Sequence, residues 1–264
     1  MTFRTERDSL GTLNVPADAY YGAQTARAID NFPISGLRAP ASLVTATVLV
    51  KKAAALANRD LARLDGNVAA AIVAAADEVL AGGLRDQFVV DVYQAGAGTS
   101  HNMNANEVLA NRAAEQLGLA RGDYSRVHPN DHVNMGQSTN DVFPTSTRLA
   151  LLLQHAPLLA ATRALADGFE KQARASDHIL KTGRTHLQDA VPLTFGQEFG
   201  GYAACLVRAA DDLERTSTQL CELNLGATAV GTGLNAGDDY RTRAIAILAA
   251  DTGLPLRTAA NLFR

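Results

Sequence analysis

Residues 128–145 concentrate polar side chains in one turn-like stretch, HPNDHVNMGQSTNDVFPT. Within it, Ser138, Thr139 and Asn140 supply hydroxyl and amide groups immediately before Asp141. Such neutral donors can bind carboxylates without burying full charges, and can stabilise negative charge that develops during a reaction. The same residue types also occur at the start of an ordinary helix, so the segment taken alone leaves both interpretations open.

The histidines of this stretch have a spacing that raises the question of a metal. His128 and His132 are four residues apart, as in helical metal-binding pairs, and Asp131 is adjacent. However, Pro129 argues against a continuous helix, and no third ligand is evident nearby. We therefore predict no metal site here.

Two glycine-containing segments resemble phosphate-binding loops only in part. In GAGTSHNMN (residues 96–104) the third glycine of a dinucleotide fingerprint is replaced by His101, and no clear strand precedes the segment. Its local alternative is a glycine turn with Thr99 or Ser100 as a helix N-cap. NLGATAVGTGLN (residues 224–235) lacks the lysine of a phosphate loop. We therefore predict no nucleotide cofactor.

A fourth polar segment, GRTHLQDAVP, covers residues 183–192. Thr185 and His186 are expected in a loop between two long helices. A lone histidine in a loop is more often structural than catalytic. Together, however, four segments rich in hydroxyl, amide and imidazole groups at the ends of rigid helices suit a site for a small anion.

Helices are the elements that would position these segments, because alanine dominates the apolar residues and β-branched alternation is sparse. Helices are predicted at residues 41–64, 67–83, 104–117, 145–180 and 194–223. At about 1.5 Å per residue, the last two would each extend roughly 45 Å, and Pro157 should bend or restart the first of them. Long helices of this kind pack in bundles and against other chains. We expect a domain boundary near residue 140, dividing the chain into residues 1–140 and 141–264.

Composition excludes several classes of function. The chain has 264 residues, 47% of them hydrophobic, and a net charge of -3 with scattered basic residues, so nucleic acid is not an expected partner. Cys205 and Cys221 lack disulfide or metal spacing and are predicted to be buried or half-buried. The N-terminus is charged where a signal peptide would be apolar, and no window is expected to span a bilayer. We therefore predict no membrane partner and a cytoplasmic location.

The polar segments resemble those of the fumarase/aspartase superfamily. The similarity extends from LGTLNVPADAYYGAQTARAIDNF (residues 10–32) to the last residues. VDVYQAGAGTSHNMNANEVLAN (90–111), QSTND (137–141) and NLGATAVGTGLN (224–235) are similar to aspartate ammonia-lyases, whereas AQTARAIDNFPISG (23–36) is closer to class II fumarases.

The resemblance implies a mainly α-helical subunit of three domains. Its long central helices would form a homotetramer, with each active site built from loops of three subunits. It implies that the substrate contacts Thr99, Ser138, Thr139, Asn140, Thr185 and His186. His186 is the catalytic candidate, since the corresponding histidine of fumarases is assigned to proton transfer. A secondary anion site would comprise Arg126, His128, Asn130 and Asp131.

The implied reaction is the reversible elimination of ammonia from L-aspartate to give fumarate, through an enediolate-like dianion. It requires no nicotinamide, flavin or metal. The alternatives are fumarate hydration by a class II fumarase, a superfamily lyase acting on argininosuccinate or adenylosuccinate, and a non-catalytic chain that acts as an interaction scaffold.

One part of the superfamily pattern is missing. The signature Gly-Ser-Ser-x-x-Pro-x-Lys-x-Asn, whose serine is taken as the general base, occurs nowhere in the 264 residues. We therefore expect the chain to be truncated at Arg264, before the C-terminal domain, and to be inactive or nearly so by itself.

Overall fold

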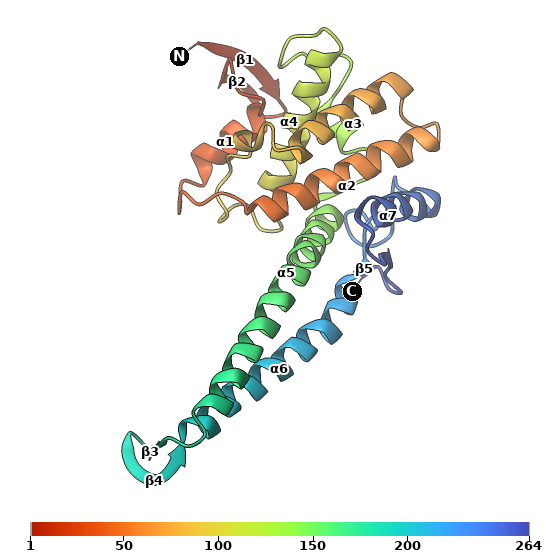
Figure 1. Cartoon of the computed structure of the whole chain (residues 1–264). Coiled ribbons are helices and arrows are strands. Elements are labelled where there is room, and N and C mark those ends of the chain that lie inside the picture. The colour runs from red at the N-terminus through yellow and green to blue at the C-terminus, as the bar shows by residue number, and fades with distance from the viewer. Residues whose placement is uncertain (1, 264) are drawn as a thin grey trace. The chain divides into compact units, whose positions relative to one another are not determined.

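The computed structural model describes residues 2–263 and confirms a mainly α-helical fold (Figure 1). The chain divides into two compact units. Unit 1 combines the residues up to 150 with those from 221 onward, and unit 2 is residues 151–220. The two-domain division at residue 140 stays a prediction, because compact units need not coincide with family domains.

Unit 1 is built from two discontinuous stretches of chain. In order, it contains β1 (Phe3–Asp8), β2 (Gly11–Pro16), α1 (Ala23–Asn31), α2 (Ala41–Asp60), α3 (Gly66–Leu80), η1 (Arg85–Gln87), α4 (Thr99–Gln116), η2 (Pro129–Val133), the start of α5 (Thr139–Ala175), β5 (Glu222–Leu223), α7 (Asp238–Thr252) and β6 (Arg257–Thr258). Strands β1 and β2 form an antiparallel hairpin, and β5 pairs with β6 in parallel.

The core of unit 1 lies between α2, α3 and α4, which pack side by side (Figure 1). Alanines at this contact are completely buried, among them Ala53, Ala54, Ala69, Ala75, Ala105 and Ala110. Small side chains let helix axes approach closely, and larger residues such as Ile72 and Leu109 fill the space left between them. Helix α7 packs against α2, so residues 238–252 join the same core.

The helical predictions at residues 41–64, 67–83 and 194–223 are confirmed as α2, α3 and α6 (Phe195–Leu220), each with shifted ends. The expected preference for helix over strand does not hold at residues 3–16, which form β1 and β2. Strands β1 and β2 alternate between exposed and covered positions, but the buried positions include Glu6, so no apolar alternation indicated a hairpin.

Helix α5 continues without interruption from residue 139 to residue 175, so a restart at Pro157 is wrong. Proline removes one N–H from a helix, so the Leu153 carbonyl lacks that donor, but the loss of one bond does not end the helix. The expectation that no window could span a bilayer is also wrong for α5, which is long and apolar enough by length and hydropathy alone. Three of its exposed apolar residues, Leu151, Leu158 and Leu165, recur every seventh position.

Unit 2 consists of the rest of α5, the antiparallel hairpin of β3 (Leu180–Thr185) and β4 (Gln188–Thr194), and α6. His186 and Leu187 form the two-residue hairpin turn, both with positive φ, at 52° and 63°. A type I′ turn requires a positive φ at both of its central residues. A tight hairpin therefore replaces the predicted loop. The prediction for Cys205 is wrong, since it lies exposed on α6, whereas Cys221 is buried as expected.

Candidate functional site

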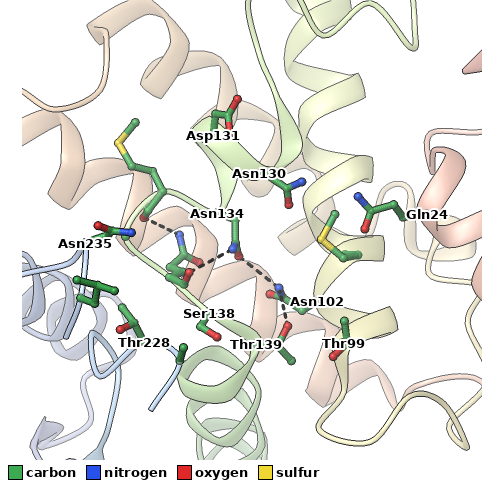
Figure 2. A pocket seen from close by; sticks show the side chains of 16 residues that line it. Gln24, Thr99, Asn102, Asn130, Asp131, Asn134, Ser138, Thr139, Thr228 and Asn235 are labelled. Atoms are coloured by element: carbon green, nitrogen blue, oxygen red, sulfur yellow. Dashed lines mark hydrogen bonds between the residues drawn. The ribbon is translucent and has the colours of Figure 1, made fainter. Parts of the chain in front are cut away.

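A polar cavity of about 650 Å³ lies within unit 1 (Figure 2). Four separate segments line it. They are Gln24 in α1, the start of α4 (Thr99, Asn102 and Met103), residues 130–131 with 134–139, and the loop that contributes Thr228, Ala229, Leu234 and Asn235. Three of the four polar segments identified in the sequence therefore meet around one hollow.

The N-terminal ends of two long helices meet this cavity. Thr99 is the first residue of α4 and Thr139 is the first residue of α5, and both line the hollow. Peptide dipoles place partial positive charge at such ends, and their first-turn N–H groups are free of helical partners. An anion in the cavity would be stabilised by both helices.

The start of α4 follows a glycine. Gly98 is the N-cap residue, with φ of 84° and no side chain to accept a hydrogen bond, so the prediction of Thr99 or Ser100 as the N-cap is wrong. Oε1 of Gln94, in the preceding loop, accepts the first-turn N–H of His101 (2.5 Å). A Cβ atom at Gly98 would lie 2.2 Å from Cδ2 of Phe143. The ring of Phe143 thus occupies the space that a side chain at residue 98 would need.

The start of α5 is fixed by a reciprocal pair of hydrogen bonds. The Asn140 backbone N–H donates to Oγ of Ser138 (3.3 Å), and the Ser138 N–H donates to Oδ1 of Asp141 (2.9 Å). This is a variant of the capping box: the N-cap Ser138 accepts the N–H of the second helical residue, and Asp141, the third, accepts the N-cap N–H. The helix therefore begins earlier than the predicted residue 145.

Asp141 also connects this turn to the glycine-rich loop. Its Oδ2 accepts the backbone N–H groups of Gly226 (2.9 Å) and Thr228 (3.0 Å), and the residue is fully buried. Thr228 has φ of 58°, which is unfavourable for a β-branched residue, and its bond to Asp141 holds it there. Burial raises the pKa of Asp141, and the three N–H donors oppose that rise. Sequence reasoning treated Asp141 only as a helix-start residue.

Neutral groups dominate the wall of the cavity. Among the described residues that line it there is no lysine, arginine or histidine, and Asp131 is the single carboxylate, with a side chain that is 76% exposed. Asn102, one of several amides that sequence reasoning missed, donates from Nδ2 to Oγ1 of Thr139 (3.2 Å). Such a wall can orient a small anion by hydroxyl and amide donors and by helix dipoles.

The predicted substrate residues divide between the two units. The cavity brings together Thr99, Ser138 and Thr139. Asn140 lies beside it rather than in its wall, because its Nδ2 donates to the carbonyl of Ala229 (2.7 Å). Thr185 and His186 belong to the β3–β4 hairpin of unit 2 and do not line this cavity.

The residues of the predicted secondary anion site are also divided. Asn130 and Asp131 line the main cavity, and Arg126 is exposed. His128 lines a neighbouring cavity of about 290 Å³, which Asn130 shares. Nδ1 of His128 accepts the backbone N–H groups of Asn130 and Asp131 (both 3.2 Å), so those donors are already engaged. The second cavity is also lined by Arg7 and by three acidic residues, Glu6, Asp8 and Glu107. A secondary anion site stays a prediction.

Comparison with known proteins assigns the chain to a family. A model of the lyase family matches residues 11–264. The chain is 55% identical to a class II fumarate hydratase of Halobacterium salinarum, over 99% of this chain and 56% of that protein. It is 51% identical to an aspartate ammonia-lyase of a Bacillus species, over 98% of this chain and 55% of that protein.

Solved structures agree with this assignment. A crystal structure of fumarate lyase:delta crystallin from Brucella melitensis superimposes with a TM-score of 0.93 at 51% identity, covering 99% of this chain and 57% of that chain. The chain thus spans a little more than half the length of the relatives it matches. The polar cavity, the helical fold and these similarities lead to one conclusion: the chain belongs to this lyase family, within the fumarase/aspartase superfamily.

Proposed function

We propose that the cavity of unit 1 binds a small dicarboxylate and forms part of a lyase site that interconverts L-aspartate with fumarate and ammonia. The observation that carries this proposal is the convergence of two helix N-termini and several neutral donors on one hollow. The similarity of the segment QSTND to aspartate ammonia-lyases favours ammonia as the leaving group. The match to a class II fumarate hydratase equally supports hydration of fumarate to malate as the alternative.

Either reaction passes through a carbanion stabilised by the adjacent carboxylate, with two units of negative charge on that group. In this proposal Thr99, Ser138 and Thr139 donate to the substrate carboxylates, and the helix dipoles stabilise the charge as it develops. Thr185 and His186 would enter the same site from neighbouring copies. The serine of the superfamily signature is not among these 264 residues, so the proposal gives this chain substrate binding and charge stabilisation.

We therefore expect the 264-residue chain to bind the dicarboxylate without catalysing the reaction. Fumarate should bind in calorimetric titration, while L-aspartate and L-malate, supplied in parallel assays, should yield no fumarate. Thr139→Val should weaken fumarate binding at least tenfold, because a hydrogen bond to a charged group contributes about 1.5–3 kcal/mol. Thr147→Val, an exposed position on the same helix, is the matched control and should bind normally. Rapid turnover by this chain, or wild-type affinity in Thr139→Val, would contradict the proposal.

Self-association belongs to the same proposal, because hairpins from neighbouring copies must reach the cavity. The exposed stripe of Leu151, Leu158 and Leu165 has the seven-residue repeat of a helix-packing face. Replacing Leu158 and Leu165 together by glutamate should convert a tetramer into smaller species, as measured by light scattering during gel filtration. Gln172→Glu, at an exposed polar position of α5, should leave the mass unchanged. A wild-type chain that stays monomeric at high concentration would exclude the tetramer. We keep the cytoplasm as the expected location.

A further inference from the structure

A lysine lies fully buried beneath the wall of the main cavity. Lys51, in α2, is 0% exposed, and its Nζ donates to Oδ1 of Asn134 (2.7 Å) and to Oε1 of Gln137 (2.9 Å). Both of these partners are neutral amides, and the carboxylate of Asp141 acts on the amine electrostatically. Burying an amine among neutral partners costs free energy of folding, which the contacts of this lysine must offset.

The lysine fixes the orientation of two amides. An amine with its hydrogens directed at a carboxamide requires the oxygen, not the nitrogen, of that carboxamide to face it. Asn134 and Gln137 both line the cavity, and each turns its oxygen toward Lys51. The Nε2 of Gln137 then donates to the carbonyls of Val133 (3.0 Å) and Met135 (3.2 Å), which ties down the turn before α5.

A third amide, that of Asn102, links Asn134 to Thr139 by hydrogen bonds. Oδ1 of Asn134 also accepts from Nδ2 of Asn102 (3.3 Å), and that Nδ2 donates in turn to Oγ1 of Thr139 (3.2 Å), as the dashed lines of Figure 2 show. A flipped Asn102 would place two oxygens against each other. Because Oγ1 of Thr139 accepts from Asn102, its own hydrogen is directed elsewhere, and Thr139 lines the cavity.

We propose that Lys51 is a positioning residue: through Asn134 and Asn102 it directs the Thr139 hydroxyl to donate a hydrogen bond to a carboxylate oxygen in the cavity. This inference rests on the proposed function, because it assigns a donor to the same ligand. Burial lowers the pKa of Lys51 to about 7, with Asp141 opposing the shift. The neutral amine keeps two N–H donors, so the amide orientations are the same in either protonation state.

A double-mutant cycle with fumarate as the probe tests this role. Lys51→Met preserves length and removes the donors, and it should weaken fumarate binding at least tenfold. If Lys51 acts through Thr139, the double variant Lys51→Met/Thr139→Val should bind fumarate no more weakly than Thr139→Val alone. Independent effects that multiply would overturn the proposal, since a general loosening of the fold would reduce affinity in either background.

Controls separate this outcome from failure of the proposed function. Lys52→Met changes the adjacent lysine, which pairs with Asp77 instead, and should leave affinity unchanged. If the wild type does not bind fumarate, the proposed function fails. If it binds and only Thr139→Val loses affinity, the inference about Lys51 fails alone. Lys51→Gln, which keeps an amide donor, repeats the cycle should Lys51→Met not fold. If neither variant folds, Lys51 is a structural residue and the proposal is overturned.

Discussion

Gly98→Ala is expected to destabilise unit 1 by about 3 kcal/mol or more and to weaken fumarate binding with it. Two costs combine at this position. The φ of 84° is unfavourable for any residue with a Cβ atom, and that atom would lie 2.2–2.4 Å from three carbons of the Phe143 ring. Either the ring or the first turn of α4 must move, and both are part of the cavity wall or adjacent to it. Chemical denaturation measures the first effect and titration with fumarate the second.

Gly168→Ala serves as the control for this substitution. Gly168 lies inside α5 without a positive φ, and nothing lies within 4 Å of its ideal Cβ position, so alanine should be neutral or stabilising by up to about 1 kcal/mol. In a Phe143→Ala background, Gly98→Ala should cost less, because the overlap is gone and only the backbone strain persists. Equal costs in both backgrounds would show that the ring does not constrain residue 98.

Asp141→Asn is expected to cost about 3–5 kcal/mol in unfolding free energy, the range for breaking a buried charged network. The carboxylate accepts three backbone N–H groups with its two oxygens. An asparagine has one oxygen, so its NH₂ group must face at least one N–H, either at Ser138 or at the glycine-rich loop. Release of that loop would also remove the bond that holds Thr228 at positive φ.

Thermal melting and fumarate titration of Asp141→Asn provide the measurement. Asp167→Asn, an exposed position on the same helix, should change neither quantity. A wild-type melting temperature for Asp141→Asn would mean that the loop is held by other contacts. Normal stability with lost binding would instead assign Asp141 to the ligand, contrary to its buried position behind the turn.

Much of the fold follows from local patterns, and the exceptions have physical causes. The alanine-rich runs predicted α2 and α3 because helix propensity and burial agree there. The β3–β4 hairpin was missed because its turn is formed by His186 and Leu187, neither of which is typical of positive φ. Its strands also carry mostly exposed side chains, so they lack an apolar alternation.

The cavity was predictable in part. The clustering of hydroxyls and amides indicated Ser138 and Thr139, and the resemblance implied Thr99. However, Asn102 and Lys51, which act on Thr139 in our proposal, are distant from it in sequence. Lys51 stands in the run VLVKKAAAL, where two lysines suggest a solvated face. Its spacing from the buried Val44, Val48 and Ala55 is helical, and that spacing was the available signal for burial. Whether Asn134 and Gln137 turn the oxygen or the nitrogen of the amide toward Lys51 depends on contacts in the folded chain, and no local sequence pattern encodes it.

The discontinuity of unit 1 has a consequence for synthesis on the ribosome. The turn that holds Asp141 emerges well before Gly226 and Thr228, the residues that donate to its carboxylate. Until those later residues are translated, the Asp141 carboxylate of a nascent chain lacks two of its three N–H donors. At the same stage α2 lacks the helix α7 that packs against it in the folded chain. Closure of such a long loop is slow relative to helix formation. The cavity therefore cannot be completed until residues 151–220 and the glycine-rich loop that follows them have been made.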